Sequence, residues 1–178
     1  MRTDIILTLT GPDRVGIVEE VTGVLLEMDG NVEANRMARL GGEFVMLSLV
    51  SLPEDNVGSV EAAFAKLAAE GYRVTSGPAL REAAPAHEGW AAYRIQVHGA
   101  DHEGIIHEIA AGLARRGITI ESAETATTAA PLSGTKLFSM NATALVPPAL
   151  SEADWRDDLG EAASRSNVDI TVSAAGGE

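Results

Sequence analysis

The chain carries the same short pattern twice, 88 positions apart. Residues 9–18 and 97–106 each end an alternating apolar stretch, pass through an Asp-x-x-Gly turn and enter a second apolar stretch. The register continues without a gap as far as Glu33 in the first copy. This self-similarity predicts a duplicated domain, with a strand, a turn and a helix in each copy. The identical pairs in the turn are Gly11 and Gly99, Asp13 and Asp101, Gly16 and Gly104, and Ile17 and Ile105.

The repeat divides the 178 residues into two domains. We place the first domain at residues 1–80 and the second at 91–178. Residues 81–90 contain alanine, proline and glycine in a composition typical of a linker. Each domain is small but able to bury a modest core.

Hydrophobic periodicity gives the elements at the start of each repeat. Apolar residues alternate with polar ones before the turn, which is typical of a strand. After the turn they recur at spacings of three and four, which is typical of an amphipathic helix. Each helix is expected to end near a glycine, Gly30 or Gly117. The expected apolar helix faces consist of Val18, Val21, Leu25 and Met28 in the first copy and of Ile106, Ile109 and Leu113 in the second.

The remaining elements complete each domain. Strands are expected at about 31–40, 43–51 and 72–76, with counterparts at 119–128, 136–146 and 168–173. Gly41-Gly42 predicts a tight hairpin, and Ser151 with Asp154 resembles a capping box. Second helices are predicted through Val57, Val60, Phe64 and Leu67 and through Trp155, Leu159 and Ala162. The resulting order, strand-helix-strand-strand-helix-strand, predicts an α+β fold of two tandem ferredoxin-like βαββαβ domains with antiparallel sheets.

The strand at 43–51 is apolar on both of its faces. Val45, Leu47 and Leu49 alternate with Phe44, Met46 and Val50. One face belongs to the core under the helices, so the other needs a cover of its own. We expect this second face to be buried against the other repeat or against a second chain, which favours a homo-oligomer.

Charge and composition exclude several function classes. The net charge is −13, and acidic residues outnumber basic ones twofold in both halves. Without a stripe of Lys and Arg, direct binding to nucleic acid is not expected. The chain has no cysteine and no apolar run long enough to span a membrane. Its start leads straight into a strand pattern, so we expect no signal peptide and a cytoplasmic location.

The turn, the helix and Asn31-Val32 at the start of the next strand together resemble an ACT domain. The segment Arg36-Met37-Ala38-Arg39-Leu40 strengthens the resemblance, which covers about residues 3–77 and 91–174. The chain is similar to tandem-ACT proteins of the glycine cleavage system transcriptional repressor type, and to the amino-terminal ACT segment of formyltetrahydrofolate deformylase. The resemblance implies a regulatory module that binds a small ligand, often an amino acid, at an interface between ACT units.

The chemistry of the turn agrees with that implication. Backbone N–H groups at a helix start have no intrahelical partners, and the helix dipole favours a carboxylate there. Asp13 and Asp101 could cap the helix or receive an ammonium group, and Asn31 offers both a donor and an acceptor. Since the second repeat replaces Arg14 by His102 and gains Glu103, the first repeat is expected to be the better site. The candidate ligand-binding residues are Asp13, Arg14, Val15, Gly16, Ile17, Asn31, Asp101, His102, Gly104 and Ile105.

Two other kinds of site are less well supported by the residues. His98, His102 and His107 lie within ten residues, which would suit zinc or nickel, but they lack a recognised ligand spacing. No nucleophile elbow or phosphate loop is present, so we expect no enzymatic activity. The deformylase resemblance ends with its ACT segment, before that family's catalytic part.

The sequence therefore predicts an amino-acid-binding regulatory protein that acts by protein–protein contact. A transcriptional regulator of the glycine cleavage type fits the resemblance, with glycine or serine as the suspected ligand. The alternative is a regulatory or adaptor subunit of an amino-acid or one-carbon metabolic enzyme, with no ligand of its own. No cofactor and no resident metal is expected.

Overall fold

The computed structural model describes residues 1–80, 87–131 and 133–175. The chain divides into two compact units, Met1–Ala83 (unit 1) and Ala84–Glu178 (unit 2). Of the linker predicted at 81–90, residues 81–86 lie outside the described part. Residues 87–90 form a short turn in which the Trp90 amide donates to the His87 carbonyl over 3.1 Å.

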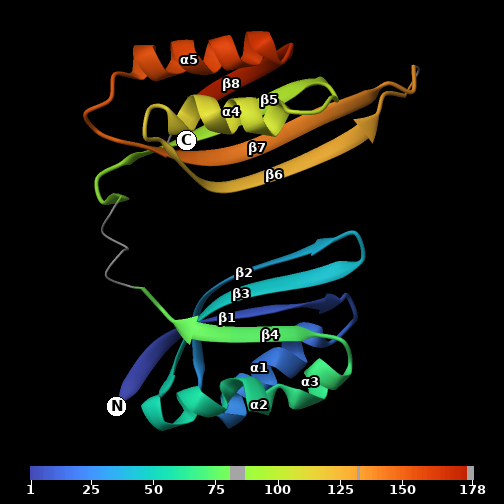
Figure 1. Cartoon of the computed structure of the whole chain (residues 1–178), viewed down its shortest axis with the longest axis vertical. Helices are drawn as coiled ribbons and strands as arrows, with labels where there is room; N and C mark the ends of the chain where they lie inside the picture. Colours follow the sequence, from blue (N-terminus) through green and yellow to red (C-terminus); the bar gives the residue numbers. More distant parts are fainter. Residues whose placement is uncertain (81–86, 132, 176–178) are drawn as a thin grey trace. The chain divides into compact units, whose positions relative to one another are not determined.

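Unit 1 is a four-stranded antiparallel sheet with its helices on one face (Figure 1). Its strand order is β2-β3-β1-β4, as the ferredoxin-like prediction requires. Gly41 and Gly42 join β2 to β3 with φ angles of 62° and 88°. Positive φ at both turn residues matches the strand twist, so the predicted tight hairpin is confirmed. The elements are β1 (Arg2–Pro12), α1 (Ile17–Glu27), β2 (Asn31–Leu40), β3 (Glu43–Pro53), η1 (Glu54–Ser59), α2 (Val60–Ala63), α3 (Ala65–Ala69) and β4 (Arg73–Pro78).

Unit 2 repeats this arrangement with the strand order β6-β7-β5-β8. Each unit even has a register shift at the same place in its second strand, between Val32 and Ala34 and between Ile120 and Ser122. The predicted fold class is confirmed. The elements are β5 (Ala91–Ala100), α4 (Ile105–Ala114), β6 (Thr119–Ala129), β7 (Lys136–Val146), α5 (Glu152–Arg165) and β8 (Val168–Ala174).

Each unit has its own hydrophobic core between sheet and helices. Alternate residues of the central strands point into it because successive strand side chains face opposite sides. Trp155, Leu159 and Ala162 of α5 are buried, as predicted from their helical spacing. In the core of unit 1 the aromatic side chain of Phe64 is fully buried.

The apolar face of α4 differs from the prediction by one residue. Ile106 was expected on that face, yet its side chain is 49% exposed, whereas Ile105 is buried. Ile105, Ile109 and Leu113 follow each other at four-residue steps, which keeps them on one side of the helix. In unit 1 the matched residue, Ile17, is likewise buried.

The two helices of the repeat end in the same hydrogen-bonded motif. The Gly30 amide donates to the Leu25 carbonyl over 2.8 Å, and the Ile118 amide donates to the Leu113 carbonyl over 3.1 Å. This pattern needs a left-handed residue just before the donor. Gly117 takes that role as predicted, with φ 68°. In unit 1 the helix also ends near its glycine, as predicted, but the left-handed residue is Asp29, with φ 54°, one position before Gly30.

The second helix of unit 1 is not continuous. The predicted span through Val57 and Leu67 consists of the 3-10 segment η1 and the short helices α2 and α3. Asn56, Gly58 and Ser59 are poor helix formers, and the Asn56 side chain instead donates to the Met28 carbonyl over 3.0 Å. In unit 2, α5 is unbroken over 14 residues. Ser151 is its N-cap but makes no side-chain cap hydrogen bond, so the predicted capping box does not form.

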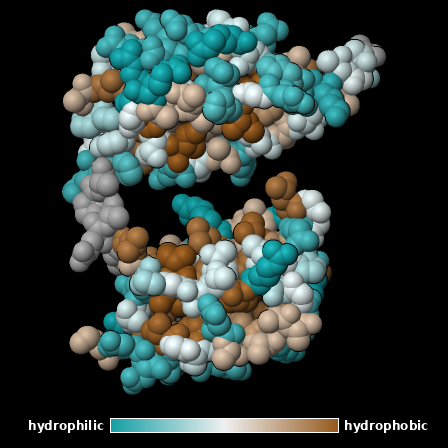
Figure 2. All heavy atoms as spheres, in the orientation of Figure 1, coloured by the Kyte–Doolittle hydropathy of each residue, from teal (hydrophilic) through white to brown (hydrophobic). Residues whose placement is uncertain are grey.

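The helix-free faces of the two sheets differ in character. In unit 1, Val45 and Leu47 of β3 are 38% and 46% exposed on that face, and Figure 2 shows hydrophobic residues along β2 and β3. At the matched positions of β7, unit 2 has Ser139 and Asn141. The two-sided apolar strand is therefore a property of unit 1 alone, and its cover by another repeat or chain stays a prediction. None of the helices in the described ranges has the length and apolarity needed to cross a bilayer.

Candidate functional site

The repeated turn joins a central strand to the first helix of each unit. Gly16 and Gly104 precede the helices with φ angles of 88° and 93°, a left-handed conformation that glycine adopts most readily. The backbone amide of Asp13 donates to the Gly42 carbonyl over 3.0 Å. The Asp101 amide donates to the Lys136 carbonyl over 2.9 Å in the same way. Each turn is thus anchored to the start of the following hairpin strand.

Neither helix start is capped by a side chain. The possibility that Asp13 and Asp101 cap their helices is therefore wrong. The first intrahelical bonds run from Glu20 to Gly16 and from Glu108 to Gly104, both over 3.0 Å. The amides before these donors have no partner four residues back, and the helix dipole adds partial positive charge there. Both turns therefore favour an anion at this position.

In unit 1 the charged turn residues already have partners within the unit. Arg14 donates to Glu20 and, over 2.9 Å, to Glu70, while Lys66 donates to Glu20 over 2.6 Å. The hydrogen bonds from Arg14 and then from Lys66 lower the pKa of Glu20. The Asp13 carboxylate accepts from Arg39 over 3.3 Å. These pairs leave little free charge at the first turn for a ligand.

In unit 2 a histidine occupies the position of Arg14. His102 Nε2 lies 2.6 Å from the Ser166 carbonyl oxygen, and Nδ1 lies 2.9 Å from the Glu103 carbonyl oxygen. Since carbonyl oxygens only accept, these two contacts favour the form of the ring in which both nitrogens carry a proton. The hydrogen bonds to Ser166 and then Glu103 raise the pKa of His102 above its ordinary value. The charge of Asp101, beside it, also raises the pKa of His102.

A hollow of about 580 Å³ opens beside this second turn. Its polar end is formed by Asp101, His102 and Gly104. Ile106 and Phe138 contribute apolar surface. Four of the candidate residues, Asp101, His102, Gly104 and Ile105, line this one hollow.

The sequence did not indicate the far wall of the hollow, which Thr125 and Thr127 of β6 form. The repeat offers a signal after the fact, because the 88-residue register matches these threonines with Met37 and Arg39. Arg39 reaches Asp13 in unit 1. Unit 1 thus has the long side chains of Met37 and Arg39 at the positions where unit 2 has two threonines.

The candidate residues of the first repeat do not form one site. Val15 is fully exposed, and Ile17 is 3% exposed within the core. Asn31 pairs with Ser51 at one end of the sheet, whereas Asp13 contacts Gly42 at the other. Nine residues of strand separate these ends by roughly 30 Å. Within unit 1, therefore, Asn31 and the turn do not form one site.

The three histidines of unit 2 do not converge either. His98 pairs with Asp169 and points to the helix-free face of the sheet, while His107 lies on α4. Both nitrogens of His102 are bonded to carbonyl groups. The described residues contain no group of side chains arranged to hold a metal ion.

Comparison with known proteins agrees with this geometry. Residues 3–71 match the family model of the ACT domain. A protein of unknown function from Galdieria sulphuraria is 31% identical over 98% of this chain and 99% of its own, with a TM-score of 0.86. Residues 3–71 therefore form a domain of the ACT family. None of the curated proteins matches it.

The ACT fold extends over both units. A candidate glycine cleavage system transcriptional repressor of known structure covers 97% of each chain, with a TM-score of 0.68 and 20% identity. At that identity the likeness concerns the fold, two tandem ACT domains. The predicted ACT domain and the predicted fold are thereby confirmed, while the regulatory role, the ligand and the binding residues are a matter for proposal.

Proposed function

We propose that this tandem ACT protein binds a free amino acid and regulates a protein partner by direct contact. The single observation that carries the proposal is the hollow beside the second turn, where an uncapped helix start adjoins His102, whose pKa is raised by its contacts with backbone carbonyls. Transcriptional regulation of the glycine cleavage type is the specific role we favour, in the cytoplasm and without catalysis. The likeness to the candidate repressor supports this choice.

The hollow offers a place for each part of an amino acid. The carboxylate would lie at the first-turn amides of α4, where the helix dipole and His102 both supply positive charge. The Asp101 carboxylate would receive the ammonium group. Ile106 and Phe138 would contact the side chain, and a small ligand such as glycine or serine would leave room for water. Binding would order the turn and change the surface offered to the partner.

The first turn favours a different role. Because Arg14 and Asp13 are paired with Glu20, Glu70 and Arg39, a ligand would have to displace existing ion pairs. We propose that unit 1 serves contact with the partner or with a second copy. An adaptor subunit of an amino-acid or one-carbon metabolic enzyme, with no ligand at all, is the alternative that this observation supports.

A thermal-shift screen against the twenty amino acids tests the proposal. A ligand that binds only the folded state adds about 2.7 kcal/mol at a hundredfold excess over its Kd. One amino acid should give a saturable shift that Asp101→Ala abolishes. Asp13→Ala removes the same charge from the matched turn and should leave the shift intact.

The outcomes separate the alternatives. A shift lost in Asp13→Ala or Asn31→Ala, but kept in Asp101→Ala, would move the site to the first repeat, as the sequence alone suggested. No shift with any amino acid would support the adaptor function. In that case a response should be found only with the protein partner.

A further inference from the structure

The helix-free face of the unit 2 sheet is polar where that of unit 1 is apolar. In unit 1, Ile6 pairs with Leu49 and Thr8 pairs with Leu47. The matched pairs in unit 2 are Arg94 with Thr143 and Gln96 with Asn141. Since both sheets have the same fold, the fold does not require polar residues at these positions. Their chemistry needs an explanation specific to unit 2.

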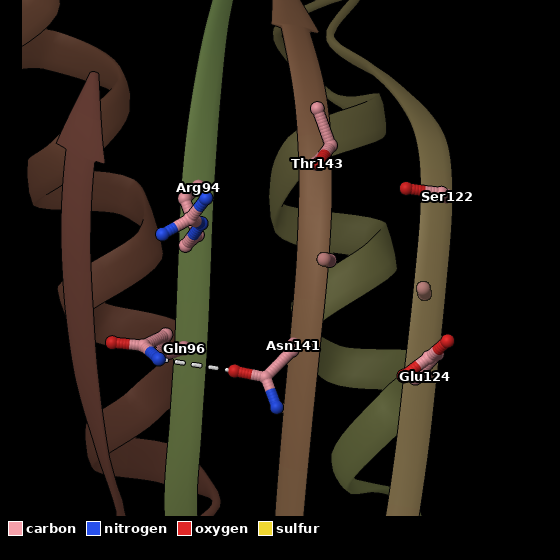
Figure 3. Close-up of a pocket in the computed structure, with 8 residues that line it drawn as sticks. Arg94, Gln96, Ser122, Glu124, Asn141 and Thr143 are labelled. Carbon is pink, nitrogen blue, oxygen red and sulfur yellow. Dashed lines mark hydrogen bonds between the residues drawn. The ribbon is translucent and has the colours of Figure 1, made fainter. Parts of the chain in front are cut away.

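These residues line a second hollow, of about 370 Å³, that extends over β5, β7 and β6. Figure 3 shows Arg94 on β5 and Glu124 on β6, on opposite sides of β7, with Asn141 between them. This hollow is distinct from the one at the turn. The turn hollow includes α4, whereas this one lies on the face of the sheet without helices.

The hydrogen bonding of the hollow leaves selected groups free. Gln96 Nε2 donates to Asn141 Oδ1 over 3.0 Å, drawn as a dashed line in Figure 3. This bond fixes the Asn141 amide and leaves its Nδ2 as a donor. Neither Arg94 nor Glu124 has an ion pair or a side-chain hydrogen bond with any residue that the structure describes. One free cation and one free anion therefore flank an oriented amide.

The spacing of these groups limits what they bind together. Arg94 lies on β5 and Glu124 on β6, with β7 between them. The two residues are also offset by two positions along the strands, so their Cα atoms lie about 12 Å apart. The strand neighbours of Arg94 are Thr143 and Ser173, which are uncharged. A ligand carboxylate at Arg94 would therefore meet no competing anion. The two charged groups of a free α-amino acid are attached to one carbon, so it spans less of this separation than a dipeptide, whose charges lie at the two ends of a peptide unit.

We propose that this face of unit 2 binds a short peptide zwitterion of dipeptide length. The peptide carboxylate pairs with the Arg94 guanidinium, and the terminal ammonium group pairs with Glu124. Asn141 Nδ2 donates to the peptide carbonyl between them. The site goes beyond the amino-acid site proposed at the turn, and either site could exist without the other.

Titration calorimetry with alanyl-alanine on the full chain tests the proposal. Saturable binding is expected, and loss of the charge-assisted bonds in Arg94→Gln should weaken it about 10- to 100-fold. Asn141→Leu, which installs the unit 1 residue, should also weaken it. Arg73→Gln is the matched control, because Arg73 lies on the same face of unit 1 and its loss changes the net charge equally.

Blocked and shortened ligands complete the test. Acetyl-alanyl-alanine amide, which lacks both charges, should not bind. Alanine should show no dependence on Arg94. The proposal is overturned if alanyl-alanine does not bind, if Arg94→Gln binds it as well as Arg73→Gln does, or if alanine loses affinity with Arg94→Gln. A failure here leaves the turn site unaffected, because that site is tested with amino acids and Asp101→Ala.

Discussion

The two turns have the same backbone and different electrostatics. In both, a left-handed glycine opens the helix and an aspartate amide contacts the hairpin strand. In unit 1 the cation at the turn is Arg14, which two carboxylates neutralise. In unit 2 it is His102, whose charged form is favoured by contacts with two backbone carbonyls. The two copies thus share the backbone conformation of the turn but differ in the groups that contact its positively charged side chain.

The packing beneath the turns shows the same division. Gly11 and Gly99 are equivalent, and a Cβ on either would lie within 3 Å of Tyr72 or Val168. The need for a small residue was therefore kept although the neighbour changed. Shared geometry and altered side-chain chemistry can be tested separately by matched substitutions in the two units.

The largest expected effect comes from removing the aromatic anchor of each core. Trp155→Ala should cost unit 2 about 3–5 kcal/mol, because it leaves a cavity under a side chain that is 1% exposed. Phe64→Ala should do the same to unit 1. Hydrogen exchange measured by mass spectrometry should show lost protection only in the unit that carries the substitution. Loss in both units from either variant would show that the two cores unfold together.

The left-handed glycines should come next in magnitude. Gly16→Ala and Gly104→Ala should each cost about 1–2 kcal/mol, from backbone strain alone. A Cβ added to either glycine would have no atom within 4 Å, so a clash is not the cause. Gly23→Ala is the control, since Gly23 has equally open surroundings inside α1 and its replacement should stabilise the protein. Unequal costs at the two turns, measured by urea unfolding, would contradict a shared backbone role.

A buried hydroxyl distinguishes the two cores. Ser48 is fully buried, and its Oγ has no hydrogen-bond partner among the described residues. The matched residue of unit 2 is Ala142. Ser48→Ala should therefore stabilise unit 1 by about 1 kcal/mol, and Ala142→Ser should destabilise unit 2 by a similar amount. If urea unfolding showed that Ser48→Ala is destabilising, the hydroxyl would have a partner in solution.

The smallest effect is a pH dependence confined to unit 2. The pKa of His102 is raised on folding, so its stabilisation is complete below pH 6.5 and is lost as the pH rises through the folded pKa. The melting temperature of unit 2 should fall over that range, and His102→Gln should flatten the change. Arg14 stays charged throughout, so the turn of unit 1 should not contribute. An unchanged profile in His102→Gln would show that His102 is not the source of the dependence.

Much of the fold could be predicted from the sequence because its signals are local. Alternation and helical spacing located the strands and most helices, and Gly41-Gly42 indicated the hairpin. The errors have local causes as well. Asn56 and Gly58 interrupted a helix whose apolar spacing was correct. The apolar face of α4 includes Ile105, whereas the prediction named the next residue, Ile106.

The candidate site was less predictable because it depends on distant parts of the chain. The repeat drew attention to Asp101, His102, Gly104 and Ile105, which do lie together. Asn31 was associated with the turn by its position in the family pattern, yet the length of a strand separates them. Thr125 and Thr127 carry no chemical signal of their own, and only the pairing of β6 with β7 places them at the hollow.

The sequence by itself determined the duplication, the order of elements and the glycines of the turn, because these follow from periodicity and from φ preferences of single residues. Only the tertiary structure decided where charge remains free. Among the partners of Arg14 and His102 are Glu70 and Ser166, which are 56 and 64 residues away. Contacts at such separations arise from sheet pairing and helix packing, which local patterns do not encode.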